Sequence, residues 1–205
     1  MKEDVLEQIV DDYLNLKGYF TIHNVKFKPA ADDKAFNKAK DSVASDIDVV
    51  GVNPRLRGIK RVWAVSCKAW QSGFDATHIL KQLNGEAKAG KRETWKYYRE
   101  LWEPRWSEAF RREILDRTGA NNFRYSIAVT HLKGDGAAWG RDPRIRSNLA
   151  GSSFSFLTLE DMWREYLGAI GTAPQPSAIG RLAQVLKAAK LLDDADLGSS
   201  TPGHP

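Results

Sequence analysis

The sequence predicts an α/β fold in which a mixed central sheet is flanked by helices. Short apolar stretches with the alternation of strands are separated by longer stretches with helical spacing. The chain has 205 residues, is 42% hydrophobic and contains seven tryptophans, so it can build a full core and is not disordered. The expected strands are residues 19–27, 46–52, 61–69, 123–130 and 154–158.

The helices follow from apolar stripes and from residues that start or stop a helix. Gly18 ends the first one, and Thr158 is placed to cap a later one. A long aromatic and basic stretch, about 91–118, reads as a helical insertion broken near Pro104. The other expected helices are residues 2–17, about 76–89, 159–170 and 177–192.

The chain divides into one main domain and a C-terminal extension. We expect the domain to cover residues 1–170, and GTAPQP at 171–176 has the composition of a linker. The helix at 177–192 could dock on its own domain or pair with a second subunit, and the pattern does not decide between them. Residues 193–205 are polar and are expected to form a tail.

Polar residues interrupt the second and third expected strands. Successive strand side chains alternate between faces, so Asp46 shares a face with Asp48, and Ser66 shares a face with Lys68. If these strands form a hairpin, two carboxylates, a hydroxyl and an ammonium group meet beside an apolar core. Buried charges need partners, so the cluster is either a salt bridge at a strand end or a site for a metal or phosphate.

Hydrolysis of a phosphodiester is the chemistry that such a cluster suits. Mg²⁺ binds through one or two carboxylates together with substrate phosphate, and Mn²⁺ could take its place. The cation polarises the phosphate, while Lys68 could position the attacking water or act on it as a base.

Three motifs resemble the PD-(D/E)xK nuclease superfamily, and they cover about the first third of the chain. SDIDVVGV, which contains Asp48, is similar to the metal-binding strand of Holliday-junction-resolvase-like members. VSCKAWQ, which contains Lys68, resembles the next strand of resolvases and of Mrr-like restriction enzymes. The first helix, with Glu7 ahead of Tyr13-Leu14, is similar to the first helix of the family.

The resemblance implies a restriction-endonuclease-like fold and particular roles for these residues. Asp48 would bind the metal, Lys68 would position or activate water, and Glu7 would hold metal or water from the first helix.

The chain departs from the family pattern at Ser66, which stands where an acid is usual. A serine cannot supply the negative charge that holds a divalent ion, although it could bind through water. Either another acid has taken over, with Glu86 and Asp46 as the main candidates and Glu7 and Asp75 as others, or the site has lost catalysis and kept DNA binding. We expect the active enzyme.

Other candidate residues lie on loops. Gln71 could bind a water or a phosphate oxygen, or it could be an ordinary loop residue. Arg141, Arg144 and Arg146 lie in a glycine-rich stretch with few acids and are candidates for phosphate contacts, although a surface loop without that role is an alternative. The aromatic insertion could stack on bases, but its helical spacing favours packing in the core.

Charge and composition agree with an anionic partner. The net charge is +5 and the isoelectric point is about 9.3. Cys67 is the single cysteine, so an internal disulfide and a cysteine-rich zinc site are excluded. The sequence shows neither a signal peptide nor an apolar run long enough for a membrane helix, so we expect a cytoplasmic protein that does not bind membranes.

The expected function is therefore a Mg²⁺-dependent (or Mn²⁺-dependent) endonuclease that acts on DNA in restriction, defence or repair. The main alternative is an inactive nuclease-fold subunit that binds DNA or supports an assembly. A third is a protein-interaction domain that uses the tryptophan-rich insertion. The form of the nucleic acid and the choice among monomer, homodimer and larger assembly stay open.

Overall fold

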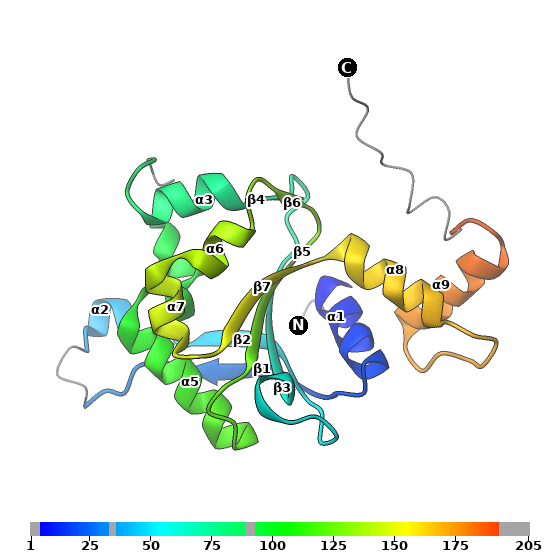
Figure 1. Cartoon of the computed structure of the whole chain (residues 1–205), viewed down its shortest axis with the longest axis horizontal. Helices are drawn as coiled ribbons and strands as arrows, with labels where there is room; N and C mark the ends of the chain where they lie inside the picture. Colours follow the sequence, from blue (N-terminus) through cyan, green and yellow to red (C-terminus); the bar gives the residue numbers. More distant parts are fainter. Residues whose placement is uncertain (1–4, 33–35, 89–92, 193–205) are drawn as a thin grey trace.

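The computed structural model describes residues 5–32, 36–88 and 93–192. A five-stranded sheet lies at the centre, in the order β1-β2-β3-β5-β7 (Figure 1). The first three strands are antiparallel and the last three are parallel, so the sheet is mixed as the sequence predicts. The strands are β1 Phe20–Phe27, β2 Ser45–Val52, β3 Val62–Lys68, β5 Arg124–Val129 and β7 Ser153–Thr158.

Helices cover both faces of this sheet (Figure 1). One face packs against α1 (Val5–Leu16) and α8 (Leu159–Ala169). α9 (Ala178–Ala188) docks on these two helices, where Ser177 donates a hydrogen bond to Asp12 at 2.5 Å. The C-terminal helix therefore packs on its own domain.

The second face carries the larger core and most of the remaining helices. These are α3 Ala76–Leu83, α4 Arg99–Trp102, α5 Pro104–Thr118, α6 Ala137–Arg141 and α7 Pro143–Leu149. The shorter elements are α2 Lys38–Asp41, the 3₁₀ turns η1 Gly58–Lys60 and η2 Thr94–Tyr97, and the paired strands β4 Phe74–Asp75 and β6 Leu132–Lys133.

The insertion is less regular than the sequence predicts. A break near Pro104 is confirmed, because Pro104 is the first residue of α5, where its missing N–H is not needed. Ahead of it the chain forms only η2 and the four-residue α4, whose side chains are all buried. The stretch at 134–151 contains α6 and α7.

The helix predicted at about 76–89 is shorter than expected. α3 ends at Leu83, and Gly85 adopts a left-handed backbone with φ of 77°. Glycine takes this conformation without steric cost and commonly follows a helix. Residues 84–88 consequently lie outside the helix. The expected parts at residues 2–4, 89, 91–92 and 193–205 lie outside the described residues.

Side chains of β2 do not alternate regularly along the whole strand. Ile47 packs in the core under α5, whereas Val49 packs on the face under α1, although they are two residues apart. The partner strand has Asn24 in a left-handed conformation, with φ of 53°, opposite this point. At Asp48, between Ile47 and Val49, the regular alternation of side chains between the two faces of the sheet is therefore broken.

Within the described residues, no helix is both long enough and apolar enough to cross a membrane.

Candidate active site

The candidate site lies where β2 and β3 separate. Their antiparallel pairing ends at Val49 and Val65. Beyond it, the backbone N–H of Cys67 donates to a carboxylate oxygen of Asp48 at 2.6 Å. β3 instead continues its parallel pairing with β5 as far as Lys68 and Val129. At this fork, Asp48 is held by the backbone of β3.

Ser66 and Lys68 face the helical layer, as their spacing predicts. Cys67 packs on the opposite face, with the core under α1, and is partly buried as a small apolar side chain. Ser66 is buried, and its interaction with Tyr125, a core residue of β5, opposes the rise in the pKa of that tyrosine. Its hydroxyl carries no charge.

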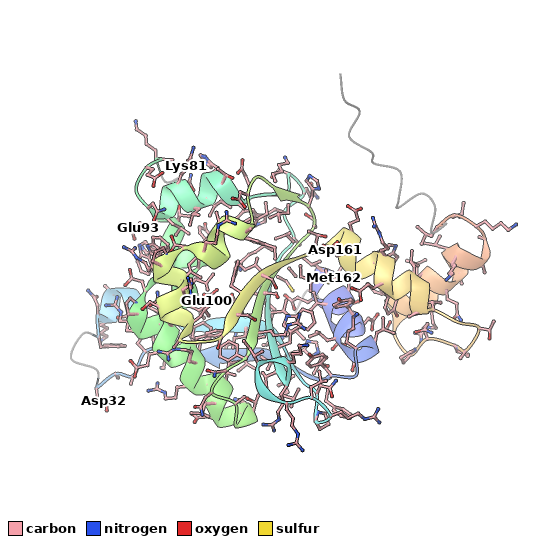
Figure 2. The ribbon with its side chains drawn as sticks, in the orientation of Figure 1. Asp32, Lys81, Glu93, Glu100, Asp161 and Met162 are labelled. Carbon is pink, nitrogen blue, oxygen red and sulfur yellow. The ribbon has the colours of Figure 1, made fainter. Side chains whose placement is uncertain are left out.

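The sequence reasoning missed Glu100, the acid that completes this cluster. Glu100 lies on α4, is almost fully buried, and accepts a hydrogen bond from the Tyr125 hydroxyl at 2.5 Å. Figure 2 shows it inside the molecule, between the helical layer and the sheet. Tyr125 therefore links Ser66 of the sheet to Glu100 of the insertion.

The charges of Asp48 and Lys68 both act on Glu100. Burial raises the pKa of Glu100 above its ordinary value, because the protein interior solvates the charged form poorly. The Tyr125 hydrogen bond and then the positive charge of Lys68 oppose this rise, while the negative charge of Asp48 adds to it. Two carboxylates and one ammonium group therefore interact around a buried tyrosine.

This donor set fits a divalent cation. Asp48 and Glu100 repel each other, and burial penalises the charge on Glu100, so both would gain from a cation between them. Across the described residues no group of three or more His, Cys, Asp or Glu is arranged to hold a metal. A Mg²⁺ site needs only one or two carboxylates when substrate phosphate and water supply the other ligands.

The other predicted acids lie elsewhere. Asp46 forms an ion pair of 2.6 Å with Lys26, because the irregularity at Asp48 breaks the alternation that would have placed both aspartates on one face. Glu86 is exposed in the turn after α3, so the expected shared helix face with Gln82 does not exist. Asp75 caps α3 by accepting from the His78 N–H at 2.8 Å.

Glu7 and Gln71 were predicted to act in catalysis. Glu7 is partly buried on α1, the helix that covers the opposite face of the sheet from Ser66 and Glu100. Gln71 is exposed in the turn that follows β3.

The three predicted arginines are all exposed but differ in their surroundings. Arg141 pairs with Asp135 at 2.6 Å, and the guanidinium group of Arg144 lies 4.3 Å from the ring centre of Trp102 on α4. Arg146 borders a surface hollow of about 590 Å³ beside α7. Arg144 therefore also helps to fix the helix that carries Glu100.

No protein-family model, curated protein or solved structure matches this chain.

Proposed function

We propose that this protein is a metal-dependent endonuclease that hydrolyses DNA phosphodiester bonds. The observation that carries the proposal is the buried carboxylate of Glu100 beside Asp48 and Lys68. A protein rarely buries an acid next to a second acid unless the pair has a function, and perturbed carboxylates with a charged partner mark candidate sites. Glu100 supplies the negative charge that Ser66 cannot.

Asp48 and Glu100 would hold the divalent cation. When bound, the cation supplies positive charge that polarises the scissile phosphate and stabilises the charge that develops during hydrolysis. The Cys67 N–H orients Asp48, and the Tyr125 hydroxyl orients Glu100, so both acids are positioned before substrate arrives. The Lys68 ammonium donates to a phosphate oxygen or to the attacking water.

The charge of the molecule supports DNA as the substrate. The net charge of +5 favours a polyanionic partner, and the exposed Arg144 and Arg146 on α7 are available for backbone phosphates. The Arg141–Asp135 ion pair is exposed, so phosphate could compete for this arginine at little cost.

A second candidate is a nuclease-fold protein that binds DNA without cleaving it. Ser66 is engaged by Tyr125, and the raised pKa of Glu100 favours its neutral form, which binds a cation poorly. An inactive protein would retain DNA binding that weakens steeply with salt and does not depend on metal.

Cleavage of supercoiled plasmid in Mg²⁺ or Mn²⁺ tests the proposal. We expect metal-dependent nicking by the wild type and its loss in Asp48→Ala and Lys68→Ala, with folding checked by thermal unfolding. A wild-type protein that shifts DNA in a salt-dependent way but never nicks it would overturn the proposal in favour of the second candidate.

A further inference from the structure

A pocket of about 480 Å³ opens on the side of the molecule that carries α3 and η2. Its size is typical of sites that bind small molecules or single chemical groups. We call it the aromatic pocket, because Trp70, Tyr97 and Tyr98 contribute rings to its wall. His78, Gln82 and Thr94 line it with polar groups.

The aromatic pocket adjoins the proposed active site through the chain itself. Trp70 follows Lys68 by two residues, and the Trp70 N–H donates to the Lys68 carbonyl at 2.9 Å. Tyr98 precedes Glu100 by two residues, and its carbonyl accepts from the Trp102 N–H of α4 at 3.0 Å. Two residues of the pocket wall are therefore joined by short backbone segments to Lys68 and Glu100.

Two aromatic side chains remain partly open to solvent at this pocket. Trp70 is 38% exposed and Tyr97 is 42% exposed. Trp70 is also held rigidly, since its ring stacks on Phe74 at a centroid distance of 5.4 Å and its carbonyl accepts from the Thr130 hydroxyl at 2.6 Å. A fixed ring with an open surface is a ready platform for stacking a flat group.

The polar side chains of the pocket wall are held in place by hydrogen bonds to one another. The Gln82 amide nitrogen lies 3.0 Å from a ring nitrogen of His78, and the Gln82 amide oxygen accepts from the Thr94 hydroxyl at 3.0 Å. These contacts join α3 to η2, so the polar edge keeps its shape without a ligand.

The lining suits a neutral ring better than a phosphate. Asp75 contributes a carboxylate, and none of the described lining residues is a lysine or arginine. A phosphate would meet this carboxylate, and the Lys133 ammonium beside the pocket already donates to the Ser72 carbonyl at 2.7 Å. A nucleobase is uncharged, stacks through its faces and forms hydrogen bonds at its edge.

Tyr98 lies in the wall of the pocket and carries a hydroxyl without a hydrogen-bond partner among the described residues. Its side chain is 1% exposed, and its hydroxyl makes no hydrogen bond within the described part of the chain. An unsatisfied buried hydroxyl is costly and therefore uncommon in proteins.

We propose that the aromatic pocket takes up one unpaired nucleobase next to the cleaved phosphate, so that the preferred substrate is DNA with an extrahelical or single-stranded base. The inference rests on the proposed nuclease function, because that function makes DNA the partner. Trp70 and Tyr97 stack on the base, and the His78–Gln82–Thr94 chain faces its edge. Fully paired duplex cannot offer this base without breaking a pair.

The experiment compares two duplexes that differ at one nucleotide. One carries a single extrahelical 2-aminopurine, and the other pairs the same 2-aminopurine with thymine. Dissociation constants are measured by fluorescence anisotropy in EDTA, so that cleavage cannot occur, and 2-aminopurine emission reports stacking. We expect the wild type to bind the extrahelical duplex about tenfold more tightly and to quench its emission.

The variants test which side chains cause this preference. Tyr97→Ala and Trp70→Ala are expected to reduce the ratio of dissociation constants to about one. Tyr97→Phe keeps the ring and the preference. Phe20→Ala is the matched control, since Phe20 is an exposed aromatic residue on β1, 72% open to solvent, and is absent from the pocket. Tyr97 is exposed, so Tyr97→Ala should fold.

The outcomes separate this inference from the nuclease proposal. Equal affinities of the wild type for the two duplexes, or a preference that survives in Tyr97→Ala, would overturn the base pocket even if plasmid is nicked. A preference lost in Tyr97→Ala would support the pocket even if nicking is absent. A protein that binds neither duplex overturns the base pocket, and nicking of plasmid in Mg²⁺ or Mn²⁺ still decides the nuclease proposal.

Discussion

The substitution Glu100→Gln tests whether Glu100 is needed for cleavage or only for the fold. Glutamine has almost the same size as glutamate, and its amide oxygen can still accept the hydrogen bond from Tyr125. The substitution removes the negative charge that would hold the cation with Asp48. If the cation contributes about 3–4 kcal/mol of transition-state stabilisation, its loss lowers cleavage by about 10²–10³-fold.

The same substitution should leave the fold intact or stabilise it. The pKa of Glu100 is raised above its ordinary value of about 4.5, so the folded state binds its proton more tightly than the unfolded state. Between the unfolded and folded pKa values, the folded state carries more protons, and the free energy of unfolding therefore falls as pH rises. Glutamine lacks this titration, so the variant should match or exceed the wild type in stability above that window.

The assay pairs plasmid nicking in Mn²⁺ with urea unfolding of the apo proteins at neutral pH. Glu86→Gln is the matched control, because Glu86 is an exposed acid on a neighbouring turn. Cleavage should be lost in Glu100→Gln and kept in Glu86→Gln. Cleavage by Glu100→Gln at the wild-type rate would refute the assignment of Glu100 as the replacement acid.

Three further predictions test the surroundings of the site. Under the proposed function, a bound metal would displace the proton of Glu100, so Mn²⁺ affinity from calorimetry should rise by about tenfold per pH unit below the raised pKa and then level off; a flat profile would contradict this. Tyr125→Phe removes the hydrogen bond that orients Glu100 and opposes its protonation. Cleavage at neutral pH should therefore fall by about tenfold and recover in part at higher pH. Unchanged cleavage kinetics would exclude a positioning role for Tyr125. Asp41 is buried and accepts a hydrogen bond from the Trp106 indole at 3.0 Å. Asp41→Ala should therefore lower the free energy of unfolding, measured by urea titration, by about 2–4 kcal/mol. A loss below about 0.5 kcal/mol would contradict this structural role of Asp41.

The strands could be predicted from the sequence because their signal is local. Each of the five strands of the sheet shows a run of apolar or alternating residues bounded by turn residues, and each predicted strand lies within a residue or so of its observed limits. The opposite orientation of Cys67 relative to Ser66 and Lys68 also follows from strand alternation alone. The mixed sheet is therefore confirmed.

Glu100 could not be found in the same way. It lies in an insertion whose aromatic residues have helical spacing, so an acid between Arg99 and Leu101 looks like part of a solvated face. Tertiary packing instead breaks the segment into η2, α4 and α5 and buries every residue of α4. The acid is brought to the sheet by contacts distant in sequence, above all with Tyr125.

The Asp46 interpretation failed for a related reason. It assumed regular alternation through β2, but the left-handed backbone of Asn24 on β1 accompanies a change of face at Asp48. An irregularity that arises in the backbone of β1 cannot be predicted from the residues of β2.

The origin of Glu100 in the insertion affects when the protein can become active during synthesis. A nascent chain that ends after β3 already contains Asp48 and Lys68, but it lacks both the second acid and Tyr125, the residue that holds it. The proposed site is completed only after β5 joins the sheet and α4 packs against it. Under the proposed function, a growing or truncated chain would be harmless to the DNA of the cell that makes it, because cleavage would require the folded helical layer.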